Sequence, residues 1–414
     1  MSVLLCLLAL GAPLTVGAAI SRAREANERP ELLRMRIEKA RALEASALSM
    51  VLPKLTFRGT YRRRSEEVSR SLGGQPTVFQ AEDALSGQLR LEATVVDARY
   101  FPLLSAAGSE AEAIELLARN ELRRLDFEVA RAFLSVALAQ EAERVTLRRI
   151  ELGREFVEDA RRRVEAGLSA RSDVSRAELE LAEATLEGRR ATSGVRLAKL
   201  ALAHLMVVEE IGPLGEAVVR TSSAPPRELA DRARENRLDL KAAVQLREAA
   251  RAAANEPLLR IAPTLGVAAN LRATNETGVS GRSVDWDLEA NLAWTLYDGG
   301  ARYADARAKH AEAREAELNL ASLERSIDLE LGQALESMRT AESAVEIAKE
   351  RARIASVNRE DVESRFRQGL ATVLERVDAG IEEFDGASRL AAERHGLELA
   401  RLGLAEIVGE QLLP

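Results

Sequence analysis

The chain has 414 residues with a formal net charge of −7, and 30% of its residues are charged. Acidic and basic residues are interspersed, so no basic stripe indicates a nucleic-acid partner, and the single cysteine, Cys6, excludes an intramolecular disulfide. The sequence has no P-loop, no G-x-S-x-G and no metal-ligand cluster, so we expect no enzyme, no metal and no cofactor. Only 3% of residues are aromatic, and abundant Ala, Leu, Glu and Arg are typical of long helices.

The N-terminal segment 3–19 is free of charge and is followed at once by charged residues. This pattern predicts a secretory signal peptide over residues 1–18, cleaved after Ala18. No Lys or Arg precedes the apolar run, which leaves the true start codon open, and Cys6 lacks the preceding small residue of a lipidation signal. The alternative is a buried N-terminal helix. No later stretch has the apolar length of a membrane helix, so any membrane contact is expected to use another element.

One sequence pattern occurs twice at an offset of 202 residues, the distance from Gly167 to Gly369. A Leu follows each Gly, and the same offset aligns many other positions without a gap. The aligned pairs include Arg123/Arg325, Asp126/Asp328, Glu128/Glu330, Glu158/Glu360, Asp159/Asp361 and Arg163/Arg365. We interpret the chain as a tandem duplication, with repeats over 19–208 and 227–414 and a linker over 209–226.

Both repeats have the same predicted order of elements: a short helical segment, two strand-like segments and two long helical tracts without proline. The short helical segments lie at about 28–50 and 227–256, and the long tracts cover 109–165, 170–208, 302–367 and 372–409. At 1.5 Å per residue, ~55 helical residues span roughly 80 Å, which indicates a coiled coil or a rod-like bundle. Glycine suits a reversal of the chain. We therefore predict two helical hairpins, 109–208 and 302–409, with the Gly-Leu pairs at their tips.

Four segments alternate apolar and polar residues with the period of a strand. They cover about 53–64, 86–97, 263–274 and 284–298. A half-buried soluble sheet would look the same, but the length suits tilted membrane-spanning strands, with Trp286 at a membrane interface. Four strands cannot close a barrel, and an open edge in hydrocarbon costs several kcal/mol per unpaired group. We therefore expect copies to share one barrel, an eight-stranded dimer or a twelve-stranded trimer, of which only the wider leaves an open channel.

In this order, four elements resemble the TolC family, the outer membrane efflux channels of Gram-negative bacteria. They are NRLDLKAA at 236–243, WTLYDGG at 294–300 and the two Gly-Leu tips. Leu238 stands where the family usually has Pro, while the first repeat keeps that Pro in Arg29-Pro30-Glu31-Leu32. The first repeat also lacks the Asp-Gly-Gly turn and has Asp97-Ala98-Arg99-Tyr100-Phe101-Pro102 instead. We expect Pro102 to kink or delay the following helix.

The resemblance implies a mainly α fold with a membrane β part. Long hairpins would form a trimeric α-barrel, and four strands per protomer would enter a twelve-stranded transmembrane β-barrel. The implied protein is a homotrimeric outer membrane channel with a long periplasmic extension, the exit duct of a tripartite efflux or type I secretion system. Its partners would be a periplasmic adaptor, an inner-membrane pump of RND, ABC or MFS type, and lipid. Neither the pump class nor the substrate (drug, metal ion or protein) is indicated. The alternative is a non-channel helical scaffold of the cell envelope, which would not need detergent for extraction.

The resemblance also implies a gate at the second hairpin tip. Glu375 and Asp378 are three residues apart on one helix face, and they match acidic positions that line the family's constriction. Three copies would place six carboxylates around the opening, and acidic rings favour cations. The alternative is that these are ordinary solvated charges. The first tip has Asp173 and Arg176 at the matching positions, so we expect divergence to have assigned the ring to the second repeat.

A latch for the closed state is the second implied device. Ser172, Asp173 and Phe366 match family positions that hold it closed, but Ala371 stands where the latch usually has Arg. We expect different contacts to replace that Arg, with Arg365, Arg367 and Arg376 as the candidates. The residues implied to contact the adaptor are those of the tip turns, Gly167, Leu168, Gly369 and Leu370.

Overall fold

The computed structural model describes residues 13–72, 75–215, 225–277 and 280–412. Its contacts divide the chain into two units, which we call the helical unit (residues 1–34, 117–240 and 323–414) and the sheet unit (residues 35–116 and 241–322). The predicted signal peptide falls largely outside the described residues, because the description begins at residue 13.

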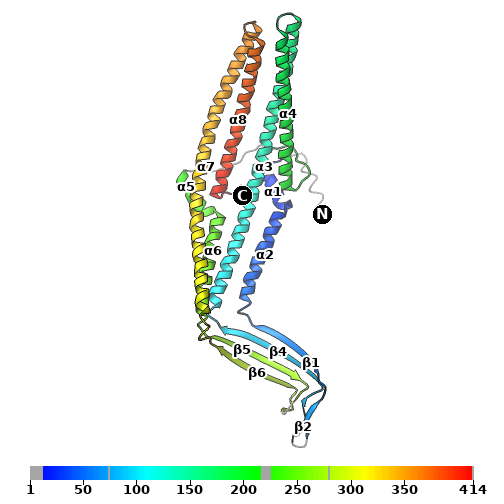
Figure 1. The fold of residues 1–414 in the computed structure, drawn as a ribbon, viewed down its shortest axis with the longest axis vertical. Coiled ribbons are helices and arrows are strands. Elements are labelled where there is room, and N and C mark those ends of the chain that lie inside the picture. Colours follow the sequence, from blue (N-terminus) through cyan, green and yellow to red (C-terminus); the bar gives the residue numbers. More distant parts are fainter. Residues whose placement is uncertain (1–12, 73–74, 216–224, 278–279, 413–414) are drawn as a thin grey trace. The chain divides into compact units, whose positions relative to one another are not determined.

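The order of elements occurs twice along the chain (Figure 1). The first half contains α1 (Val16–Ala26), α2 (Glu28–Leu48), β1 (Lys54–Arg63), β2 (Val68–Leu72), β3 (Gln75–Gln80), β4 (Asp83–Val96), α3 (Tyr100–Glu165) and α4 (Arg171–Met206). The second contains α5 (Pro226–Asn236), α6 (Leu238–Leu259), β5 (Thr264–Thr274), β6 (Val284–Ala293), α7 (Ala301–Arg367) and α8 (Val373–Val408). None of the described helices combines the length and the apolar composition that a membrane span requires.

Two long hairpins, α3–α4 and α7–α8, reverse at the Gly-Leu pairs, and both turns lie at the same end of the helical unit (Figure 1). Gly167 and Gly369 adopt left-handed φ values of 72° and 76°. The amide of the following Leu donates to a carbonyl one turn back: Leu168 to Arg163 and Leu370 to Arg365, both at 2.8 Å. This hydrogen-bonding pattern is a Schellman cap, which requires glycine because a side chain disfavours the left-handed conformation.

The expectation for Pro102 was wrong. α3 begins at Tyr100, well before the predicted start at 109, and Pro102 lies in its first turn. The first amides of a helix have no acceptor within it, so the missing N–H of proline costs nothing there. The amide of Arg99 instead donates to the Asp97 carboxylate at 3.0 Å. In the second repeat, the amides of Gly300 and Arg302 donate to the Asp298 carboxylate, each at 3.0 Å. The turns before α3 and α7 therefore both use an aspartate as the acceptor for backbone amides, despite their different sequences.

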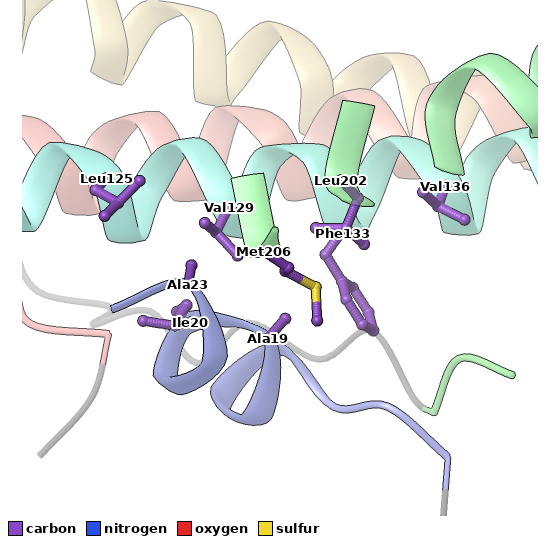
Figure 2. Close-up of a cluster of buried hydrophobic side chains, with 9 residues drawn as sticks. All are labelled: Ala19, Ile20, Ala23, Leu125, Val129, Phe133, Val136, Leu202 and Met206. Carbon is purple, nitrogen blue, oxygen red and sulfur yellow. The ribbon is translucent and has the colours of Figure 1, made fainter. Parts of the chain in front are cut away.

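A buried apolar cluster joins α1, α3 and α4 in the helical unit (Figure 2). Phe133 of α3 is fully buried, and Ile20 of α1 and Met206 of α4 belong to the same cluster. Helix α1 begins after its N-cap Thr15, so the predicted cleavage position after Ala18 lies inside this helix. Residues 16–18 thus form the start of the helix whose later residues Ala19, Ile20 and Ala23 are buried in the cluster.

Acidic residues that the duplication repeats on α3 and α7 form ion pairs with arginines in or next to the short helices α1, α2 and α5. In the first repeat, Arg24 donates to Asp126 at 2.8 Å and Arg29 to Glu128 at 2.6 Å. In the second, Arg234 donates to Asp328 at 2.9 Å and Arg237 to Glu330 at 2.6 Å. The aligned carboxylates Asp126/Asp328 and Glu128/Glu330 therefore have the same structural role in both halves. Burial alone lowers the pKa of Arg237, but hydrogen bonds to Asp239 and Glu330 outweigh burial and raise it.

The sheet unit contains a four-stranded antiparallel sheet in the order β1-β4-β5-β6 (Figure 1). Its register places apolar residues opposite one another, as in the row Phe57, Leu89, Leu271 and Trp286. The next row, Thr56, Arg90, Asn270 and Asp287, is polar. Because successive side chains of a strand point to opposite faces, the sheet has one apolar face and one polar face.

Three predicted ranges differ from the structure. The segment between the predicted strands 53–64 and 86–97 contains the paired strands β2 and β3, and β4 begins within it at Asp83. β6 ends at Ala293, before the predicted 298. The segment 227–256 forms two helices, because α5 ends at Asn236 and Arg237 adopts an extended conformation.

Candidate functional site

The hairpin tips carry a cluster around Phe366 at the end of α7. Phe366 is buried together with Phe156 of α3 and Val377 of α8. The guanidinium carbon of Arg163 lies 3.8 Å from the centre of the Phe366 ring, and that of Arg376 lies 4.7 Å from it. Cations over an aromatic face are attracted by its negative quadrupole. The ring therefore brings Arg163 of the first hairpin and Arg376 of the second to one place.

Arg376 also carries an ionic link between the hairpins. It donates to Asp159 of α3 at 2.9 Å and to Glu363 of α7 at 2.7 Å. Of the three arginines proposed to replace the family's latch Arg, Arg365 and Arg367 have ion-pair partners only within their own hairpin, in the part of the chain that the structure describes. We call Asp159, Arg163, Glu363, Phe366 and Arg376 the tip latch.

Glu375 and Asp173 have a local role that the sequence pattern did not reveal. Each is the third residue of its helix and accepts a hydrogen bond from the backbone N–H of the residue before the helix, from Thr372 at 2.7 Å and from Ala170 at 3.3 Å. Thr372 also accepts from the amide of Glu375, which completes a capping box. The backbone and side-chain hydrogen bonds of Thr372 lower the pKa of Glu375, so this carboxylate is held ionised at neutral pH.

The predicted gate residues are only partly brought together. Glu375 and Asp378 are both exposed on α8, and Ser172 is exposed at the start of α4. Among the described residues, no hydrogen bond or ion pair joins Ser172 or Asp173 to the second tip. Sequence reasoning missed Asp159, Arg163 and Glu363. Asp159 and Arg163 are positions that the duplication repeats, and this repetition was the available signal.

The polar face of the sheet has its own hydrogen-bonded network. Arg90 of β4 donates to Asn270 of β5 at 3.2 Å, and Asn270 donates to Asp287 of β6 at 2.8 Å. Glu92 accepts from Arg90 at 3.1 Å. Such a continuous polar surface is suited to water and ions. Within the described residues, no group of His, Cys, Asp and Glu is arranged to hold a metal ion.

Comparisons with known proteins identify the class first by fold. The chain is similar to the outer membrane protein VceC from Vibrio cholerae, with a TM-score of 0.81, 18% identity and 96% of each chain covered. It is similar to the MtrE outer membrane channel of Neisseria gonorrhoeae, with a TM-score of 0.79, 17% identity, and 96% of this chain and 89% of the other covered. It is also similar to CusC, with a TM-score of 0.83, 14% identity, and 95% of this chain and 92% of the other covered. The fold is therefore that of outer membrane channels.

The sequence of the second repeat gives a second comparison. Residues 229–410 match the family model described as outer membrane efflux protein. No curated protein sequence matches the chain. The family match of the second repeat and the fold agree with the resemblance inferred from the sequence. This family comprises transport ducts, not enzymes.

The pH dependence of the tip latch follows from Glu363. Burial alone raises the pKa of Glu363, but hydrogen bonds and charge from Arg376 and Arg367 lower it below its ordinary value of 4.5. A carboxylate with a depressed folded pKa stabilises the structure above its unfolded pKa, and this contribution is lost as the pH falls through the folded value. We expect the link between the two hairpin tips to be unchanged from neutral pH to about pH 5 and to weaken only below it.

The distance between spin labels on the two tip turns, recorded as a function of pH, measures this dependence. The variant Glu363→Gln has no titrating group at this position and is the control, since its acid response is expected to be weaker. Separation of the wild-type tips already above about pH 5 would contradict the assignment to this carboxylate.

Proposed function

We propose that this chain assembles as a homotrimer into the gated exit duct of a tripartite efflux or type I secretion system. The observation that carries the proposal is the two-faced sheet with two open edges. On its apolar face the side chains of Phe57 and Trp286 are 74% and 72% exposed, an arrangement that water disfavours and lipid favours. β1 and β6 each have only one neighbouring strand. Sharing a twelve-stranded barrel between three copies would pair both edges and place the polar face around a water-filled lumen.

The helical hairpins would continue the duct into the periplasm as an α-barrel. In the closed state, the tip latch would hold the two hairpins of each protomer together, because Arg376 binds carboxylates from both. Leu168 and Leu370 at the tip turns are 75% and 68% exposed. Exposed apolar side chains at equivalent turns suit contact with a periplasmic adaptor, which would connect the duct to an inner-membrane pump of RND, ABC or MFS type.

The proposed selectivity filter is the ring of Glu375 and Asp378. We expect the variant Glu375→Gln/Asp378→Asn to lose most of the cation selectivity of the reconstituted channel, because six negative charges leave the opening. Glutamine preserves the helix cap, since Gln also serves at the third position of a capping box. The measurement is the reversal potential under a salt gradient across a planar bilayer.

The matched control is Glu382→Gln/Asp385→Asn, which removes the same charges at the same spacing one heptad farther along α8, where both residues are exposed. We expect a smaller change there, because the duct is proposed to be narrowest at the tips. An equal change in both variants would show that charge along the wall, rather than a ring at the tip, sets the selectivity. Release of the protein without detergent would favour the scaffold alternative over the channel.

A further inference from the structure

The two open edges of the sheet carry opposite charges on its polar face. On β1, the polar positions include Lys54, Arg58 and Arg62, and the strand has no acidic residue. On β6, they include Asp285, Asp287 and Glu289, and the strand has no basic residue. Every residue of both strands is exposed. One edge of the sheet is therefore cationic and the other anionic.

The register of the sheet places cations of β1 and anions of β6 at opposite ends of the same rows. Arg58 pairs with Gln88, Gln88 with Arg272, and Arg272 with Asp285. In the same way, the row that starts at Lys54 passes through Glu92 and Ala268 and ends at Glu289. Each row thus begins with a cation on β1 and ends with an anion on β6.

Several of these edge charges have no ion-pair partner in the part of the chain that the structure describes. Among the described residues, Lys54, Arg58 and Asp285 form no ion pair, whereas Arg90 on the inner strand β4 has both Glu92 and Glu289 within ion-pair distance. The backbone on the free side of β1 and of β6 also has no strand neighbour. Both the backbone groups and the side-chain charges of each edge are thus available to a second strand.

In the shared barrel proposed above, β1 of one copy pairs with β6 of the next, and we propose that the opposite charges of these two edges select this pairing over contacts of like edges. The proposal rests on the proposed function, in which several copies share one barrel. β1 and β6 run antiparallel to each other through the sheet, so a β1–β6 contact continues the antiparallel order.

The charges matter because the alternatives are also antiparallel. Two copies related by a twofold axis could pair β1 with β1, or β6 with β6, and either contact would place like charges opposite each other. Pairing β1 with β6 is heterologous and generates a ring that closes. We call the contact between the cationic edge of β1 and the anionic edge of β6 the charged seam. It favours the ring over a twofold dimer of sheets.

Charge reversal tests the seam on the full chain extracted in detergent. The variants are Lys54→Glu/Arg58→Glu on β1, Asp285→Lys/Glu289→Lys on β6, and their combination. Each double variant is expected to lower the association constant of the oligomer at least about tenfold, because two attractive pairs become repulsive. The combined variant restores opposite charges with the edges exchanged and is expected to recover the wild-type oligomer. Light scattering after size exclusion measures the oligomer, and circular dichroism verifies that each variant is folded.

The matched control is Arg272→Glu, a charge reversal in the same row as Arg58 but on the inner strand β5, which is expected to keep the oligomer. Raising the ionic strength is expected to weaken the wild-type oligomer, since the seam faces water. If the wild-type chain forms no oligomer, the proposed function itself fails. If the wild type assembles and either folded double variant assembles equally well, or the combined variant does not recover, the charged seam is refuted and the shared barrel is not.

Discussion

Replacing Arg376 with Met is expected to release the two hairpins from each other at their tips and to raise the open probability of the proposed channel. Met preserves most of the apolar contact with Phe366 and Phe156 but removes the cation between Asp159 and Glu363. The two carboxylates, 26% and 21% exposed, then face each other without their shared donor. Losing the hydrogen bonds of Arg376 to these charged groups costs about 1–3 kcal/mol, which corresponds to a roughly 5–150-fold shift between closed and open states.

The matched control is Arg367→Met, which removes a cation from the same tip. Arg367 is 76% exposed and, among the residues that the structure describes, pairs only with Glu363 of its own hairpin, at 3.2 Å. Exposed pairs of this kind contribute about 0–1 kcal/mol, so opening is expected to change little. Single-channel recording of both variants measures the difference. Equal opening of the two variants would show that net charge at the tip, rather than the link between hairpins, holds the closed state.

Local sequence patterns predicted the parts of this fold that local physics determines. The period-two alternation identified four strands, and the residues of one row, such as Phe57 and Leu89, do lie on one face of the sheet. The two Gly-Leu pairs identified both hairpin turns, because only glycine readily adopts the φ values observed at Gly167 and Gly369. The same logic failed at Pro102, where the position within the helix, rather than the residue type, decides whether proline breaks it.

The latch was beyond sequence reasoning for a different reason. Whether Arg376 reaches Asp159 depends on how far one hairpin slides along the other, and helices rich in Arg and Glu form ion pairs in many registers. The sequence therefore did not distinguish Arg365, Arg367 and Arg376 as candidates to replace the family's latch Arg. Burial of Phe366 beside Phe156 sets the register, and this contact joins residues 210 positions apart in a sequence that has few aromatic residues. Glu375 was predicted by family resemblance alone, and its cap on Thr372 was not anticipated.

Replacing Phe133 with Ala is expected to have the largest effect on stability. Phe133 is fully buried where α1, α3 and α4 meet, and its ring lies beside Met206 and Ala19 (Figure 2). Truncating a buried Phe removes its burial and leaves a cavity, which together cost about 3–5 kcal/mol. Since the buried residues of α1 are Ala19, Ile20 and Ala23, all in this cluster, we expect α1 to detach first, which would also weaken the ion pair of Arg24 with Asp126.

The denaturant midpoint of the helical circular dichroism signal measures this loss, and protease cleavage near Arg24 reports detachment of α1. The matched control is Phe101→Ala, the same truncation on the same helix at a side chain that is 80% exposed. Its midpoint is expected to stay close to that of the wild type, because no cavity forms at an exposed position. If Phe101→Ala cost as much as Phe133→Ala, contacts made only in the assembled duct, rather than the core within each copy, would limit its stability.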